Sequence, residues 1–145
     1  MFKKMKFKVL MFAAAVFLGA GNLYAWNVNI YSDLTDAITA STTTITFTAA
    51  NINFAGNPAI SYAGPVNIYG NGATLNGINT YRFFTFTNTN VRFYDNINFI
   101  NGYSGSNGGA ILNEANSTMT FTGSVVNFSS NTAGGGGQGQ HTCRR

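Results

Sequence analysis

The sequence predicts an all-β protein, a right-handed parallel β-helix of about three to four coils with a short helical cap at its N-terminal end. Past residue 40, apolar residues come in short, often alternating runs bounded by Gly or Asn, as strands between tight turns require. These runs recur in sets of three, each about 20 to 29 residues long. Charged residues make up only 8% of the chain, against a usual share of about 25%. Stacked coils disfavour charge because like charges about 5 Å apart repel.

A β-sandwich is the alternative fold, because it also consists of many short strands joined by Gly and Asn turns. Its hairpins need Asn-Gly or Asp-Gly turns between runs of matched length. Only Asn71-Gly72 and Asn76-Gly77 come close to that pattern. We therefore favour the β-helix.

Residues 1–25 have the pattern of a secretory signal peptide. The basic start "MFKKMKFK" is followed by an apolar stretch of about 12 residues, "VLMFAAAVFLGA", and by the short segment "GNLYA". The apolar stretch is too short to span a bilayer comfortably, so an uncleaved anchor is the weaker alternative. We expect cleavage after Ala25 and export to the extracellular space or the outer-membrane surface, or to the periplasm if the chain is truncated.

Residues 26–43 are expected to form an N-terminal cap segment. A stack of coils needs a cap because its first coil otherwise exposes a bare core and an unpaired edge. The segment "SDLTDAITA", Ser32 to Ala40, is the one helix candidate, with Ser32 or Asp33 as its N-cap. The apolar face of this helix consists of Leu34, Ala37 and Ile38.

Residues 44–133 carry the predicted coils, beginning with an incomplete set, "TITFT" and "INFAG". The full sets are "AISY", "VNIY" and "ATLNG" from Ala59; "FFTF", "VRFY" and "INFING" from Phe83; and "AILN", "TMTF" and "VVNFSSN" from Ala110. We expect Ile, Val, Leu and Phe inside the coils, Thr, Asn and Ser outside, and Gly or Asn at corners that need positive φ. Stacked Asn side chains should also hydrogen-bond from coil to coil. Alternation along a strand predicts that either Phe83 or the pair Phe84 and Phe86 belongs to the core.

Residues 134–145 form a Gly-rich tail that departs from this pattern. The next coil should begin with two glycines and apolar residues, but the chain continues as "GGGGQGQHTCRR". We expect a truncated or frame-shifted C-terminus. A short flexible tail on a complete small protein is the alternative.

The distribution of charge argues against nucleic acid as a partner. The formal net charge is +4, but six of the eight basic residues lie at the two ends of the chain. Only Arg82 and Arg92 lie between them, so the sequence has no basic patch that would track a phosphate backbone.

The sequence predicts no catalytic, cofactor-binding or metal-binding residues. Glycoside hydrolysis needs two positioned carboxylates. Asp33 and Asp36 lie in the cap, while Asp95 and Glu114 follow strands at places that are not equivalent in the repeat. His141 and Cys143 have the spacing of two metal ligands, but two ligands with no others nearby make a weak site. We therefore do not expect an enzyme.

Two motifs point to a known family. "GGAI" at Gly108 to Ile111 and "FSSN" at Phe128 to Asn131, followed by another glycine pair, resemble the repeats of polymorphic outer membrane proteins. "FING" at Phe99 to Gly102 resembles a degenerate copy, with its Asn one place early. The strict match covers about 30 residues, and the chain holds one clear copy. The residues that carry the structural repeat motif are Gly108, Gly109, Ala110, Ile111, Phe128 and Asn131.

This resemblance implies an autotransporter adhesin, in which a signal peptide precedes a β-helical passenger and a C-terminal β-barrel displays the passenger outside the cell. The expected function is therefore that of a secreted or surface-exposed adhesin-like protein, a truncated passenger fragment with a structural or adhesive role. Its partners would be host-cell or neighbouring-cell surface molecules or glycans, and it would associate with the outer membrane only through the missing barrel.

A small secreted carbohydrate-binding or carbohydrate-degrading β-helix protein is the alternative function. Exposed aromatic rings stack on sugars, although packing in the core is the stronger expectation for each ring. The candidate rings are Tyr62, Tyr69, Tyr81, Phe83, Phe84, Phe86, Phe93 and Tyr94.

Overall fold

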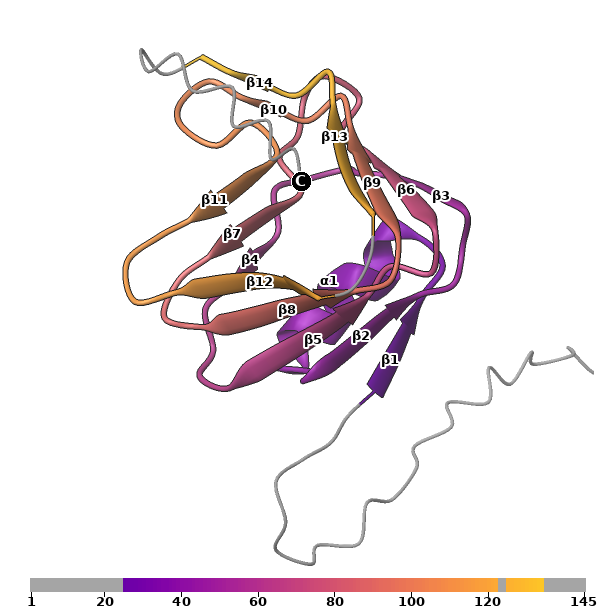
Figure 1. The fold of residues 1–145 in the computed structure, drawn as a ribbon, viewed down its shortest axis with the longest axis vertical. Coiled ribbons are helices and arrows are strands. Elements are labelled where there is room, and N and C mark those ends of the chain that lie inside the picture. Colours follow the sequence, from indigo (N-terminus) through magenta and orange to yellow (C-terminus); the bar gives the residue numbers. More distant parts are fainter. Residues whose placement is uncertain (1–24, 123–124, 135–145) are drawn as a thin grey trace, which may run out of the picture.

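The protein is a parallel β-solenoid of about four turns, with one short helix near its N-terminal end (Figure 1). The computed structural model describes residues 25–122 and 125–134. The expected signal peptide up to residue 24 and the expected tail beyond residue 134 lie outside the described residues. Every strand pair in the described part of the chain is parallel, so the predicted parallel β-helix is confirmed.

Strands of successive turns stack into three sheets that run along the solenoid. The first sheet has the order β1-β2-β5-β8-β12, the second β3-β6-β9-β13 and the third β4-β7-β11, while β10 and β14 form a small separate sheet. The elements are β1 (Ala25–Val28), α1 (Tyr31–Thr39), β2 (Thr44–Phe47), β3 (Asn51–Asn53), β4 (Ala59–Ile60), β5 (Pro65–Tyr69), β6 (Ala73–Asn76), β7 (Phe84–Phe86), β8 (Asn90–Tyr94), β9 (Ile97–Ile100), β10 (Tyr103–Ser104), β11 (Ile111–Asn113), β12 (Thr118–Thr122), β13 (Val126–Ser129) and β14 (Thr132–Ala133).

The sets of three runs seen in the sequence correspond to turns of the solenoid. Each full set supplies one strand to the third sheet, one to the first and one to the second. The register places apolar residues of successive turns side by side: Ile68 of β5 lies beside Phe93 of β8, and Phe93 lies beside Phe121 of β12. An apolar period in the sequence therefore becomes a continuous apolar column inside the coils.

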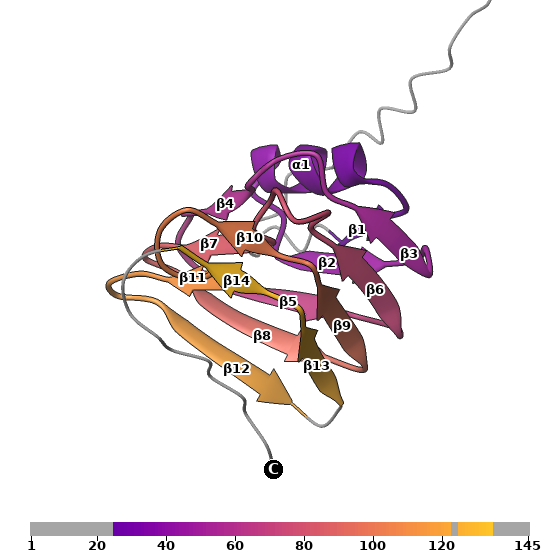
Figure 2. The ribbon, with the colours of Figure 1, turned by 90° about the horizontal axis from the view of Figure 1, so that it is seen from above.

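Coil stacking begins one strand before the first run noted in the sequence. Apart from its first residue, Ala25, β1 lies within the segment expected to act as the cap, and it pairs in parallel with β2, with Val28 beside Phe47. Helix α1 follows β1 and lies across the end of the solenoid in Figure 2. The N-terminal end of the stack is therefore covered by a helix.

The helix begins one residue earlier than the sequence predicts, and its N-cap differs. The N-cap is Ile30, with extended φ and ψ of −137° and 168°, so the expectation of Ser32 or Asp33 in that role is wrong. The Asp33 carboxylate instead accepts hydrogen bonds from the backbone N–H groups of Asn29 and Ile30, at 2.8 and 3.2 Å. A carboxylate three residues into the helix satisfies donors that a capping side chain would otherwise leave to solvent. Leu34 and Ala37 are buried as expected.

Phenylalanine rings fill the interior. Phe83, Phe84 and Phe86 are all fully buried, so the expectation that only one of the two sets is core is wrong. Alternation applies within a strand, and Phe83 lies one residue before β7, at the corner. Its ring turns inward between Phe54 and Phe99, with centroids 5.0 and 5.2 Å away.

Asparagine makes the corners and ladders between coils, as the composition predicts. Among the described residues, nine non-glycine residues have positive φ, and five of them are Asn. Asn76 donates to Asn53 and Asn101 donates to Asn76, each at 3.1 Å, so one amide ladder spans three turns. These side chains tolerate left-handed backbone and also pair with their own kind in the next turn.

Candidate functional site

The glycine pair of the repeat motif lies at the end of the loop over residues 103–108, which connects β9 to β11. Gly108 has a φ of +65°, which L side chains adopt at a cost. A Cβ on Gly109 would collide with the backbone of Thr132 in the following turn, so only glycine lets the two turns approach this closely. The glycine pair therefore closes the base of the loop.

The Phe-x-x-Asn motif joins the last turn to the turn before it. Phe128 stacks on Phe99, with centroids 4.9 Å apart and rings inclined by 13°. Three residues later, Asn131 accepts a hydrogen bond from Gly102 N–H at 2.7 Å and donates one to the Phe99 carbonyl at 2.9 Å. The spacing of the motif thus places a ring and an amide on the same stretch of the preceding turn. The first of these contacts satisfies the buried N–H of Gly102, just after β9.

The other motif residues have ordinary roles in the coil. Ile111 is half-buried and lies beside Phe84 in the third sheet. The Ala110 carbonyl accepts a hydrogen bond from the backbone N–H of Phe83 at 2.8 Å. In the degenerate copy, the side chain of Asn101 bonds to Asn76 in the amide ladder instead of to the backbone of the preceding turn.

Arg82 braces the loop, and sequence reasoning missed it. Its Nε donates to the Gly108 carbonyl at 2.7 Å, and its Nη2 donates to Ser104 Oγ and to the Asn107 carbonyl, each at 2.5 Å. Its Nη1 donates to Thr85 Oγ1 at 3.0 Å. One side chain therefore ties the start and the end of the loop to the coil. The only sign in the sequence was that Arg82 is one of two basic residues away from the chain ends.

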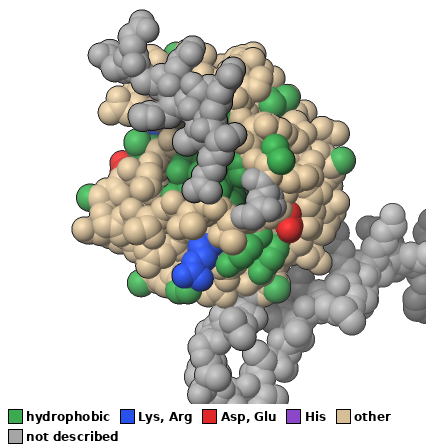
Figure 3. All heavy atoms as spheres, viewed as in Figure 1, with side chains coloured by type: hydrophobic (Ala, Val, Ile, Leu, Met, Phe, Trp, Pro, Cys, Tyr) green, Lys and Arg blue, Asp and Glu red, His purple; other side chains and the backbone are tan. Residues whose placement is uncertain are grey.

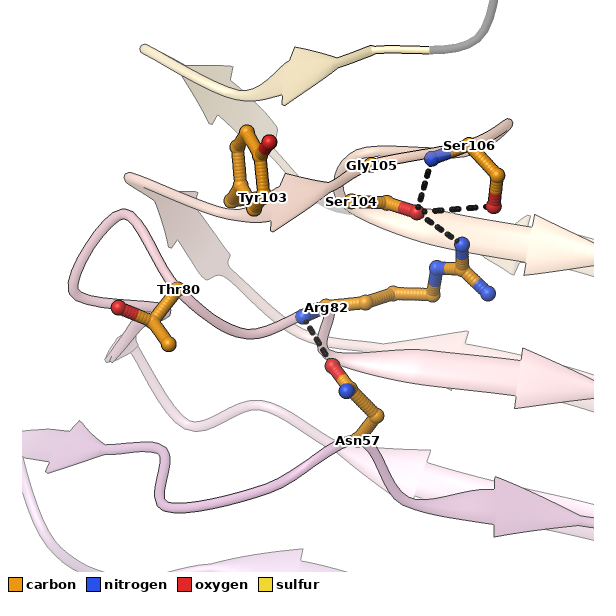
Figure 4. A pocket seen from close by; sticks show the side chains of 7 residues that line it. All are labelled: Asn57, Thr80, Arg82, Tyr103, Ser104, Gly105 and Ser106. Atoms are coloured by element: carbon orange, nitrogen blue, oxygen red, sulfur yellow. Dashed lines mark hydrogen bonds between the residues drawn. The ribbon is translucent and has the colours of Figure 1, made fainter.

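A groove of about 290 Å³ lies between this loop and the corner before β7 (Figure 4). Tyr103 is 39% exposed at its edge. The lining residues are Asn57, Thr80, Arg82, Tyr103, Ser104, Gly105 and Ser106. The lining is thus polar, with one cation and one aromatic ring.

Neutral oxygens surround the Arg82 guanidinium. Within residues 25–122 and 125–134, its hydrogen-bond partners are carbonyl and hydroxyl oxygens, and no carboxylate pairs with it. Burial lowers the pKa of Arg82, while the charge of Glu114 acts in the opposite direction. The site therefore holds a positive charge whose nearest partners carry none.

The carboxylates that the sequence singled out do not come together at this groove. Glu114 follows β11 and accepts a hydrogen bond from Thr87 Oγ1 at 2.6 Å. Asp95 is an exposed corner residue with a φ of +64°. Asp33 and Asp36 lie in α1. None of these carboxylates lines the groove.

No group of three or more His, Cys, Asp or Glu side chains able to hold a metal ion occurs among the described residues. The pair His141 and Cys143 lies outside them. None of the helices described is long and apolar enough to cross a membrane.

Two of the aromatic candidates lie on the outer surface of the first sheet. Tyr69 and Tyr94 stack with centroids 4.9 Å apart and rings inclined by 14°, and both are half-buried. Tyr62 instead donates its hydroxyl to the Thr42 carbonyl at 2.6 Å, and burial raises its pKa to about 12. Phe83, Phe84, Phe86 and Phe93 are core residues, which excludes them as a surface for sugars.

Comparison of the chain with protein-family models, with curated proteins and with solved structures yielded no significant match.

Proposed function

We propose that this chain is a secreted or surface-exposed adhesin-like protein, a fragment of a β-helical passenger of the polymorphic-outer-membrane-protein type. Its role is structural and adhesive: a stiff solenoid carries a loop that contacts molecules or glycans on a host cell or a neighbouring cell. The observation that carries the proposal is the way the glycine pair, Asn131 and Arg82 fix the base of loop 103–108.

The contacts of the motif explain why an adhesin would keep it. Gly109 and Asn131 bring two turns together at the base of the loop, and Arg82 fixes the loop from within. The loop is thus presented with little conformational entropy left to lose on binding, which favours affinity. Exposed Tyr103 supplies a ring of the kind that dominates binding surfaces.

An adhesion assay tests this role. Beads coated with the protein are applied to cultured cells and to other bacteria, and retention is measured under flow. Tyr103→Ala should reduce retention by about tenfold or more, as expected for an anchoring ring. Ile78→Ala, at an exposed corner outside the loop, is the matched control and should change little. Equal retention by wild type and Tyr103→Ala would argue against the loop as the adhesive element.

The fragment part of the proposal has its own test. The gene is sequenced beyond the codon for Gly137 and translated in all three frames. Further coils with glycine pairs and Phe-x-x-Asn, followed by amphipathic barrel strands, would support a passenger. A confirmed stop with nothing coil-like downstream would remove the display mechanism.

Carbohydrate binding by the chain alone is the second candidate function, and the groove beside Arg82 favours it. A cation, an exposed ring and several hydroxyl groups in one polar groove are the groups that bind acidic sugars. Calorimetry with neutral and carboxylate-bearing oligosaccharides tests this function. Binding that requires the sugar carboxylate and is lost in Tyr103→Ala, but not in Tyr69→Ala, would support it, and heats no larger than those of dilution would refute it.

A further inference from the structure

The C-terminal end of the solenoid exposes side chains whose register partners in the turn before it are buried. Phe121 and Phe128 are each 37% exposed, whereas Phe93 and Phe99, which lie beside them in register, are buried. Figure 3 looks onto this end and shows apolar side chains gathered at its centre. Within residues 25–122 and 125–134, no further turn packs on this face.

The backbone at this end is also unpaired. Among the strands that the structure describes, β12 and β13 are the last of the first and second sheets, so each has a neighbour on one side only. Thr118 donates its N–H to the Thr89 carbonyl of the preceding turn. Backbone N–H groups alternate in direction along a parallel strand, so those of the alternate residues Met119 and Phe121 point toward the open edge. Such an edge is a template for another strand.

This edge lacks the features by which proteins usually block edge pairing. Residues 115–134 contain no charged side chain and no proline. The strands β12 and β13 consist of Thr, Met, Phe, Val, Asn and Ser. Two copies of β12 and β13 therefore carry no like charges of their own that would repel each other at this edge.

The opposite end cannot serve as the partner surface. Helix α1 lies across the first turn, and its Leu34 and Ala37 are buried against the core. Head-to-tail stacking of copies is therefore blocked by the helix. The remaining arrangement is tail to tail, in which the same face of both copies meets across a two-fold axis.

We propose that the 145-residue chain forms a dimer with a second copy of itself through this end, with β12 and β13 of each copy pairing and Phe121 and Phe128 forming the shared core. In a longer passenger the next coil would occupy the same face. The proposal concerns self-association and does not rest on the adhesive role.

Sedimentation equilibrium of the full chain, from about 1 to 100 μM, tests the proposal. A reductant is present so that Cys143 cannot form an intermolecular disulfide. We expect a monomer–dimer equilibrium. Phe121→Lys should weaken the dimer by about tenfold or more, because it buries two like charges across the axis. Ile78→Lys adds the same charge at an exposed corner away from this face and should leave the dimer intact.

Because Phe121 also stacks on Phe93, Phe121→Lys can destabilise the fold itself, and a second variant is needed to separate folding from dimerisation. Thr120→Lys places a charge on an already exposed side chain of the edge strand, and circular dichroism reports whether the fold is kept. It should weaken the dimer as well. A monomer at all concentrations would overturn the proposal. So would an association that survives both lysine variants of β12, because it would then arise from another part of the chain, such as its N-terminal segment.

Discussion

Replacing Gly109 with alanine tests the packing that sets the base of the loop. The added Cβ would meet the backbone nitrogen, carbonyl carbon and oxygen of Thr132, so no side-chain rotation can relieve the clash. Overpacking of this kind costs about 1–3 kcal/mol in the free energy of unfolding. Because β14 is a two-residue strand at the end of the chain that the structure describes, we expect part of the strain to be released by loss of the β10–β14 pairing.

The assay is urea unfolding followed by circular dichroism, combined with hydrogen exchange at the amides of Thr132 and Gly134. In the folded state these amides donate to the carbonyls of Gly102 and Ser104. Gly105→Ala is the matched control, because a Cβ there would meet nothing nearer than the Tyr103 hydroxyl at 4.0 Å. In Gly109→Ala only, we expect the free energy of unfolding to fall by about 1–3 kcal/mol and the two amides to exchange faster. Equal stability of the two variants would refute the close approach of the turns and with it the physical reason for the glycine pair.

Three further predictions follow from the same structure. Asn131→Ala leaves the buried Gly102 N–H without its side-chain acceptor and should cost about 1–3 kcal/mol in urea unfolding, whereas Asn127→Ala, which loses one exposed hydrogen bond, should cost less than about 1 kcal/mol. Arg82→Gln removes the brace and should speed amide exchange within residues 103–108 with little change in β6 and β9; unchanged exchange in the loop would contradict the brace. Tyr62 has a folded pKa of about 12, above its ordinary value of 10.0, so its contribution to stability is complete below pH 10 and is lost as the pH rises toward 12. Alkaline unfolding should therefore be less steep in Tyr62→Phe than in the wild type, and identical pH profiles would contradict a buried hydroxyl.

The periodic part of the fold was predictable because it depends on local pattern. Short apolar runs bounded by Gly and Asn marked nearly every strand that lines the coil, and the sets of three matched the turns. The helix was found to within one residue. Its N-cap was missed because Asp33 acts from the third position of the helix, where a carboxylate reaches back to the donors before it.

The candidate site was only half predictable. Glycine pairs and Phe-x-x-Asn stood out as motifs, but their purpose depends on Gly109 and Asn131 meeting turns that lie more than 20 residues away in the chain. Arg82 was missed because its contacts lie up to 26 residues downstream, and a single Arg before a strand carries no local signature of them.

The sequence by itself determined that this protein is a charge-poor stack of parallel coils, because period, turn residues and the absence of charge are all local properties that stacking requires. Only the tertiary structure decided how the ends and the loop differ from the coils. Helix α1 covers one end, while Phe121 and Phe128 remain exposed at the other, although they have the same residue type as the buried Phe93 and Phe99. Burial depends on whether another turn lies above a residue, and nothing in that residue's own stretch of sequence specifies it.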